Sequence, residues 1–349
     1  MSRLMISVSG VRGIVGADFN PLEVARWTAA LADVLGPGPV VLGRDSRTTG
    51  AALAQAAASV LRACGRETWD LGIVPTPTVQ LAVEHWKAAG GLILTASHNP
   101  APWNALKFVD GNGGFLSPER FPELRRRAEA GAAPYAEAAR YGRMHDRGME
   151  AIRLHREAIL RAVDIDAIRS AGVRTTVDTG HGAGGVILPA LAADLGVTLV
   201  CHNEEPSGEL AANPEPSEDS LDRFLRAVSG SPAFVAMIDP DADRFAVALP
   251  GSAVLGEEGT LPLVVRSVLA GRIGPVVTNL STSSRVEAAV ARFGVPVTRT
   301  PVGEAHVVAG MRQVGAVIGG EGNGGVIDPA VHFGRDAAVA FARLCEAEA

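Results

Sequence analysis

The chain has few cysteines, and their placement limits what they can do. Cys64, Cys201 and Cys345 are odd in number, lie far apart and form no C-x-x-C pair. This pattern fits neither a disulfide framework nor a zinc site, both of which need paired or closely spaced thiols. Isolated thiols are typical of a protein kept in a reducing compartment, so we expect a cytoplasmic location.

Long apolar runs and an excess of positive charge are also missing. Residues 1–16 contain no cleavable apolar segment, and the longest apolar stretch, residues 184–201, is interrupted by Pro189 and Asp194. No segment is therefore expected to span or anchor in a membrane. The formal net charge of -6 argues against nucleic acid as a partner. Arg125 to Arg127 form a basic run that we interpret as a solvated helix face.

Lysine is nearly absent, because the 32 basic residues include only Lys87 and Lys107. Arginine replaces lysine wherever it can serve, so a surviving lysine is a candidate for a task that arginine cannot perform. Losing a proton at ordinary pH is such a task. We expect Lys107 to have this role and Lys87, late in a helical pattern, to be a surface residue.

Apolar strand-like runs alternate with segments of helical period along the whole chain, which predicts an α/β fold with mixed, mostly parallel sheets flanked by helices. Three consecutive domains are expected, at residues 1–147, 148–252 and 253–349, with linkers at 130–147 and 251–259. Polar motifs follow the strands, so we expect them to meet in an active-site cleft between domains. Strands are predicted over residues 40–43, 91–95, 173–178, 197–201, 234–238, 275–279, 295–300 and 316–319.

An acidic loop directly follows the apolar run that ends at Ile238. Asp239, Asp241 and Asp243 occupy alternate positions, and Pro240 prevents a continuing helix. Three carboxylates repel one another unless a cation lies between them, and an oxygen-only set favours Mg²⁺. A calcium EF-hand is excluded because Arg244 stands where that loop needs glycine. A solvated acidic turn is the alternative interpretation.

A second polar loop, Thr95 to Pro100, follows another predicted strand. Pro100 disfavours helix at Asn99, so Ser97 is expected in an exposed loop. Thr95 and Asn99 occupy the two glycine positions of a hydrolase nucleophile elbow, which makes acyl transfer a poor interpretation. A serine that accepts and returns a phosphoryl group fits better, with an ordinary turn serine as the alternative.

These loops resemble motifs of the α-D-phosphohexomutases, the family of phosphoglucomutase, phosphomannomutase and phosphoglucosamine mutase. The chain is similar to that family in its phosphoserine loop, metal loop, sugar-binding loop and N-terminal arginine loop. These motifs occur along the chain in the same order as in the family. The matching segments are Thr95 to Pro100, Asp239 to Arg244, Gly320 to Gly324 and Ser9 to Gly13, supported by Arg44 to Arg47 and Thr300 to Gly303.

The resemblance implies an enzyme that interconverts hexose 1-phosphates and hexose 6-phosphates through a phosphoserine and a 1,6-bisphosphate intermediate, which also serves as activator. Mg²⁺ would be held by the Ser97 phosphate and the three aspartates. The other implied roles are proton transfer by Lys107 with Arg12, phosphate contacts from Arg12, Arg244 and His98, and substrate binding by Glu321, Asn323 and Gly303. His98 could instead only shape its loop.

Several positions depart from the family pattern. Asn323 stands where many members have serine, Gly325 where several have histidine, and Ala105 where glycine is frequent. His306 is a candidate substitute for the missing histidine, whereas His155, His181, His202 and His332 are expected to be ordinary polar residues. Members also carry a fourth, phosphate-clamping domain, which we do not expect in this chain; its loss would weaken substrate binding.

Three other functions remain open at this stage. Without a fourth domain, the chain could be a sugar-phosphate-binding protein or a weak phosphatase in which water intercepts the phosphoserine. A third alternative is an NAD-dependent oxidoreductase, because Gly180 to Gly185 satisfies G-x-G-x-x-G after a strand, with Glu204 and Glu205 further on. Asp178 argues against it, since its carboxylate would face a pyrophosphate.

Overall fold

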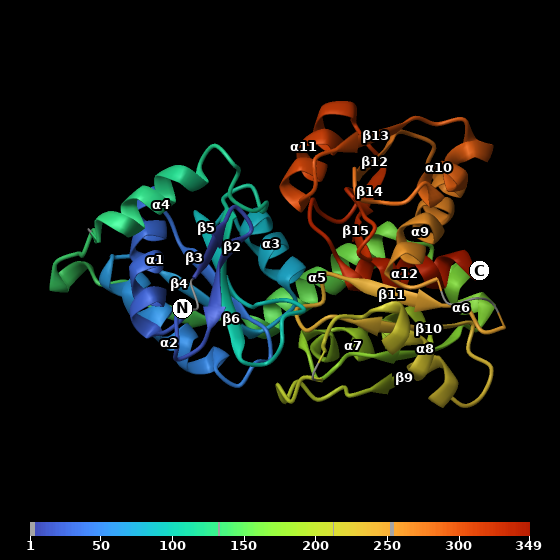
Figure 1. Cartoon of the computed structure of the whole chain (residues 1–349), viewed down its shortest axis with the longest axis horizontal. Coiled ribbons are helices and arrows are strands. Elements are labelled where there is room, and N and C mark those ends of the chain that lie inside the picture. The colour runs from blue at the N-terminus through green and yellow to red at the C-terminus, as the bar shows by residue number, and fades with distance from the viewer. Residues whose placement is uncertain (1–3, 132, 212, 252–254) are drawn as a thin grey trace. The chain divides into compact units, whose positions relative to one another are not determined.

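The computed structural model describes residues 4–131, 133–211, 213–251 and 255–349. The described chain divides into two compact units (Figure 1). The first comprises Met1–His155 with Ser207–Asn213, and the second comprises Arg156–Pro206 with Pro214–Ala349. Helix α5 (Gly148–Ala162) contains the boundary between the two units.

The described part of the first unit contains a mixed sheet of seven strands in the order β1-β2-β6-β5-β3-β4-β7. Pairing is parallel among β3, β4, β5 and β7 and antiparallel among β1, β2, β6 and β5. The strands are β1 (Met5–Ser7), β2 (Gly10–Ile14), β3 (Val40–Arg44), β4 (Thr68–Ile73), β5 (Gly90–Leu94), β6 (Trp103–Asp110) and β7 (Met144–Asp146).

Helices cover both faces of this sheet because its central strands are apolar on both sides. In β5, Leu92 and Leu94 join the core with α1, α2 and α4, whereas Ile93 joins a second core with α3 and the start of α5. This alternation is the period of two that a pleated strand imposes. The helices are α1 (Pro21–Val34), α2 (Gly50–Ala63), α3 (Thr76–His85) and α4 (Phe121–Ala130), with a 3₁₀ turn at Ala138–Arg140.

The second unit contains two sheets of four described strands each, in the orders β11-β10-β8-β9 and β13-β12-β14-β15. In each sheet the inner pairs are parallel, and one edge strand, β11 or β15, is antiparallel. The strands are β8 (Arg174–Asp178), β9 (Thr198–His202), β10 (Phe234–Ile238), β11 (Phe245–Ala248), β12 (Val276–Asn279), β13 (Val297–Thr300), β14 (Ile318–Glu321) and β15 (Gly325–Ile327).

Helices α9 and α12 contact both sheets of the second unit, which explains why the two sheets form one compact body. The ring of Phe341 in α12 packs edge-on against that of Phe234, which in turn packs against Phe245. The helices are α6 (Ile165–Ala171), α7 (Leu188–Leu195), α8 (Glu218–Ala227), α9 (Glu257–Gly271), α10 (Arg285–Val290), α11 (Glu304–Val314) and α12 (Ala337–Ala347), with 3₁₀ turns at Ala183–Val186 and Ala291–Phe293.

The α/β fold class is therefore confirmed, and the strands expected from the sequence lie within two residues of their predicted positions. The predicted linker at residues 130–147 is partly wrong, because Met144–Asp146 is a strand that pairs with β4. Part of the other predicted linker, residues 252–254, lies outside the described residues, and α9 begins within its last third. No helix in the described part of the chain is long and apolar enough to cross a membrane.

Candidate active site

The serine loop begins where β5 ends. Ser97 is buried, with 8% of its surface exposed, so the expectation of an exposed serine is wrong, and its backbone is left-handed with φ of 49°. A non-glycine residue in this conformation is strained and persists only where its surroundings hold it. The Ser97 N–H donates to the Thr95 hydroxyl at 2.9 Å, and the Ser97 hydroxyl lies 3.4 Å from Nδ1 of His98. The loop thus presents Ser97 in one defined conformation.

Arg47 holds this loop, a role that the sequence did not reveal. Its side chain is only 1% exposed and pairs with Asp45, Nε to Oδ2, at 3.0 Å. Its remaining N–H groups donate to four carbonyl oxygens of the serine loop and the following turn. The acceptors are Ser97 and Asn99 at 2.6 Å, Pro100 at 2.9 Å and Trp103 at 3.1 Å.

Arg12 and Lys107 lie on one face of the first sheet. Arg12 of β2 is paired with Ala105 of β6, and Lys107 follows Ala105 by two residues, so all three side chains are on the same side. Nη1 of Arg12 lies 3.4 Å from the Asn99 amide oxygen. Nζ of Lys107 lies 5.6 Å from the ring centre of Phe115. The register therefore gathers Arg12, Lys107 and the serine loop at one region of this unit.

The acidic loop connects β10 and β11 in the second unit. Asp239, Asp241 and Asp243 are fully buried, and one oxygen of each lies within 4.8 Å of the others. Ala242 has a left-handed φ of 55°, a strained turn that brings the flanking aspartates to the same side. Oδ1 of Asp239 accepts the backbone N–H groups of Asp243 and Arg244 at 3.1 and 3.0 Å.

The electrostatics of this cluster favour a bound cation. Burial raises the pKa of Asp239 well above its ordinary value, and the carboxylates of Asp243 and Asp241 raise it further. Three buried oxygen donors converging on one point are the ligand set of a hard divalent ion such as Mg²⁺. The residues present therefore fit a metal ion chemically, as the sequence predicted.

The glycine-rich loop after β8 supports the acidic loop. The Ala183 N–H donates to the Pro240 carbonyl oxygen at 2.8 Å, and a Cβ on Gly182 would lie 2.7 Å from the Pro240 Cα. A Cβ on Gly185 would lie 1.8 Å from the Glu204 carbonyl oxygen. The glycines of this G-x-G-x-x-G segment thus allow close approach of protein backbone, where a dinucleotide site would need room for a pyrophosphate.

The sugar-binding loop joins β14 and β15 in the same unit. Oε1 of Glu321 accepts from Nδ2 of Asn279 at 2.6 Å and from the Gly303 N–H at 3.0 Å. Gly303 has a φ of 121° and precedes α11. Oδ1 of Asn323 accepts the Gly325 N–H at 3.2 Å. The predicted substrate residues Glu321 and Gly303 are therefore in direct contact.

Two arginines contact the acidic loop, and one of them also contacts the sugar-binding loop. Arg244 reaches Glu215 at 3.0 Å through Nη1, and its Nε lies 3.8 Å from Oδ1 of Asp243. Arg335, the second residue whose role the sequence did not reveal, contacts both Asp243 and Glu321. An arginine in a short turn before a helix carries no sequence signal of such contacts.

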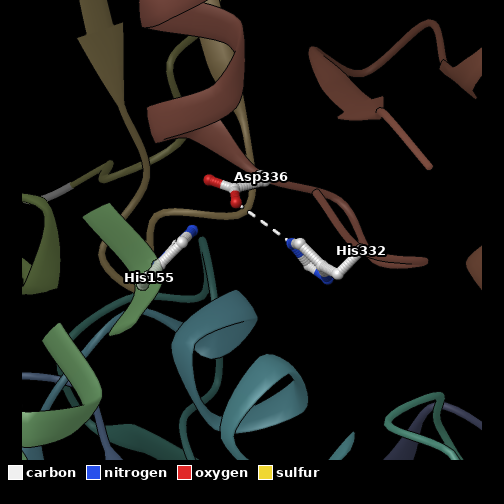
Figure 2. A group of neighbouring side chains, drawn as sticks. All are labelled: His155, His332 and Asp336. Atoms are coloured by element: carbon white, nitrogen blue, oxygen red, sulfur yellow. Dashed lines mark hydrogen bonds and ion pairs between the residues drawn. The ribbon is translucent and has the colours of Figure 1, made fainter. Parts of the chain in front are cut away.

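The histidines take varied positions. His306 lies beside Gly303, where a Cβ on the glycine would be 3.7 Å from the imidazole. His332 is buried, and its Nε2 lies 3.0 Å from Oδ2 of Asp336, the residue that caps α12 (Figure 2). His155 contacts the Thr78 hydroxyl at 2.8 Å. His155 and His332 thus each have a polar partner, while the role of His306 stays a prediction.

The sheets flanked by helices, with polar loops at strand ends, define the class of protein as α/β. The chain matches the three domain models of phosphoglucomutase/phosphomannomutase, alpha/beta/alpha domains I, II and III, at residues 3–134, 154–251 and 259–349. It belongs to this family of phosphomutases.

Relatives of known name agree with this assignment. The chain is 35% identical to a phosphoglucomutase/phosphomannomutase of Thermococcus kodakarensis, over 97% of this chain and 75% of the relative. It is 30% identical to a phosphoglucosamine/phosphogalactosamine mutase of Sulfurisphaera tokodaii, over 98% and 76%. A crystal structure of a phosphomannomutase candidate from Thermus thermophilus superposes with a TM-score of 0.87 at 30% identity, covering 99% of this chain and 80% of that one.

Proposed function

We propose that this protein is a phosphohexomutase that interconverts hexose 1-phosphates and hexose 6-phosphates by way of a phosphoserine at Ser97. The observation that carries the proposal is the serine loop itself. A strained, left-handed Ser97 held by the buried Arg47 is a feature that a passive turn serine does not need. Membership of a phosphomutase family and the buried acidic loop support the same interpretation.

The proposed reaction consists of two phosphoryl transfers. In the first, the P–O bond to Ser97 breaks and a bond forms to the 6-hydroxyl oxygen of a hexose 1-phosphate. The hydroxyl proton passes to the freed Ser97 oxygen with assistance from Lys107, with Arg12 nearby. In the second, the resulting 1,6-bisphosphate has reoriented, and its P–O bond at carbon 1 breaks as the phosphoryl group returns to Ser97. The proton of the Ser97 hydroxyl passes to the freed sugar oxygen. Hexose 6-phosphate is released, and the phosphoserine is restored. Free hexose 1,6-bisphosphate would activate the unphosphorylated protein by the same second step.

The remaining residues bind and orient the reactants. Asp239, Asp241 and Asp243 would hold Mg²⁺ together with the Ser97 phosphate, and the bound ion would offset negative charge on the transferring group. Arg244 would donate to phosphoryl oxygens, and His98 would contact the phosphate or shape the loop. Gly303, whose N–H donates to Oε1 of Glu321, would lie beside the substrate and hold that carboxylate. Glu321 and Asn323 would bind sugar hydroxyls. Oε1 of Glu321 accepts two protein donors, whereas Oε2 accepts one, from Arg335, so Oε2 is the natural place for a hydroxyl.

The test measures phosphorylation of Ser97 by mass spectrometry and the formation of products by assay. The purified chain is treated with Mg²⁺ and glucose 1,6-bisphosphate, and phosphate on Ser97 is located by intact mass and peptide mapping. Glucose, mannose and glucosamine 1-phosphates are then supplied, and 6-phosphate and inorganic phosphate are both measured. We expect phosphoserine and isomerisation. Binding of hexose phosphates without phosphorylation would make the protein a binding protein, and phosphate release exceeding isomerisation would make it a phosphatase.

A further inference from the structure

Arg335 is the point at which three carboxylates of the second unit meet. It lies just before α12, with 9% of its surface exposed. Its Nη2 donates to Oδ2 of Asp243 at 2.6 Å, its Nη1 to Oε2 of Glu321 at 2.9 Å, and its Nε to Oε2 of Glu304 at 3.0 Å. These partners belong to the acidic loop, the sugar-binding loop and the first turn of α11.

The guanidinium group is suited to this position because it offers a rigid, planar set of donors that never loses its charge. Burial acts against that charge, but Asp243, Glu321 and Glu304 outweigh it, and the pKa of Arg335 is raised above its ordinary value. A lysine could not direct three hydrogen bonds in one plane. Removing the cation would leave three acidic side chains in a region with little access to water.

Gly325 makes room for this side chain. A Cβ on Gly325 would lie 2.3 Å from Cδ and 2.9 Å from Cγ of Arg335, closer than any Cβ contact can be. These atoms are in the middle of the side chain, so a small end-group rotation cannot relieve the overlap. Arg335 can therefore occupy this buried position only because residue 325 has no side chain.

We propose that Arg335 is a positioning residue that orients Asp243 for the metal ion and Glu321 for the sugar, thereby linking the two loops. Only the part of this inference that concerns Glu321 and the sugar rests on the proposed function. By binding Oδ2 of Asp243, Arg335 assigns Oδ1 to the cation. By binding Oε2 of Glu321 from one side, it fixes the direction in which that oxygen accepts a hydroxyl.

Mn²⁺ binding measured by electron paramagnetic resonance tests whether Arg335 orients Asp243 for the metal ion, and it requires no catalytic turnover. In Arg335→Met, we expect the Mn²⁺ dissociation constant to rise about 10- to 100-fold, the usual effect of losing a residue that orients a metal ligand. The KM for hexose 1-phosphate should rise as well. Arg335→Lys should lie between the parent and Arg335→Met for both quantities.

Arg343→Met is the matched control. Arg343 is a buried arginine of α12, paired with Asp328 at 2.8 Å and with Glu346 at 2.7 Å, neither of which belongs to the acidic loop or the sugar-binding loop. Its loss should lower the melting temperature while leaving the Mn²⁺ dissociation constant and the KM of the folded protein unchanged. A merely structural role for Arg335 predicts this same outcome for Arg335→Met, and that result would overturn the proposal.

Gly325→Ala provides a test that keeps the arginine. The added methyl group should displace Arg335 and raise the Mn²⁺ dissociation constant in the same direction. In Arg335→Ala, the same glycine substitution should have little further effect, because no side chain remains to displace. Additive effects of the two substitutions would contradict the proposal.

If Arg335→Met does not fold, Mn²⁺ binding by Gly325→Ala and Arg335→Lys tests the same proposal. If the parent protein has no mutase activity but Arg335→Met still weakens Mn²⁺ binding as expected, the proposed function is refuted and the role of Arg335 at the metal site stands.

Discussion

The guanidinium group of Arg47 donates a hydrogen bond of 2.6 Å to the carbonyl oxygen of Ser97. The two residues are fifty positions apart, and the contact fixes the peptide that follows a strained, left-handed serine. Three further carbonyl oxygens of the same stretch accept from Arg47. The conformation of the proposed phosphoryl carrier therefore depends on an arginine that need not touch the substrate.

Arg47→Met should lower the free energy of unfolding by about 3–5 kcal/mol, because it removes the buried guanidinium that is paired with the buried Asp45. Denaturant unfolding measures this loss. Phosphorylation of Ser97 by glucose 1,6-bisphosphate should also slow in the folded fraction. Arg62→Met is the control, since Arg62 donates to the Gly142 carbonyl oxygen at an exposed site. Equal effects of the two substitutions would show that Arg47 does not hold the loop.

Ser97→Ala should lower kcat by roughly 10⁴-fold or more, because the residue that carries the phosphoryl group is lost. The melting temperature should change little, since alanine loses no buried packing. Coupled assay of hexose 6-phosphate and intact mass after treatment with glucose 1,6-bisphosphate measure both effects. Ser170→Ala, at an exposed position in α6, is the control. Mutase activity retained by Ser97→Ala would refute its role.

Asp241→Asn should weaken Mg²⁺ and Mn²⁺ binding on the order of 100-fold, because one of three anionic ligands becomes neutral. Without a divalent ion, the variant should be at least as stable as the parent, since repulsion among the buried carboxylates falls. Thermal unfolding with EDTA and with Mg²⁺ measures the difference. Asp222→Asn, a partly exposed residue of α8, should keep the full stabilisation by Mg²⁺. An unchanged metal titration in Asp241→Asn would remove the metal assignment.

Glu321→Gln should lower kcat/KM for hexose 1-phosphate by about 100-fold, the effect of losing a charged acceptor for a hydroxyl group. The effect should fall mainly on KM if Glu321 binds the sugar equally in the ground state and the transition state. Steady-state kinetics separate the two parameters. Glu287→Gln, which alters a surface pair with Arg299, should leave both unchanged. Normal KM and kcat in Glu321→Gln would place the sugar elsewhere.

Gly182→Ala should weaken Mn²⁺ binding, because its methyl group would lie 2.7 Å from the Pro240 Cα and displace the acidic loop. Mn²⁺ titration followed by electron paramagnetic resonance gives the change. Gly271→Ala, where an added Cβ meets no atom within 4 Å, is the control. Calorimetry of the parent with NAD should give no heat of binding. Saturable NAD binding that Gly182→Ala abolishes would instead support the dinucleotide interpretation of this loop.

Much of the fold followed from hydrophobic patterning. Buried strands such as Phe234–Ile238 appear at their predicted positions because a run of apolar residues between turn residues has few other stable arrangements. Several strands were not predicted, among them Trp103–Asp110 and Met144–Asp146. The three residues of Met144–Asp146 are exposed and carry only one apolar side chain, and they form a strand by pairing with β4. Short edge strands depend on the neighbour that accepts them.

The sequence by itself determined the family, the alternation of strands and helices, and the loops that carry Ser97, the three aspartates and Glu321. It could do so because each loop directly follows an apolar strand and combines residue types with a specific chemistry. The tertiary structure alone revealed the contacts of Arg47 and Arg335. A buried arginine is stable only where carbonyl or carboxylate oxygens from distant segments surround it, and those segments come together only in the folded chain.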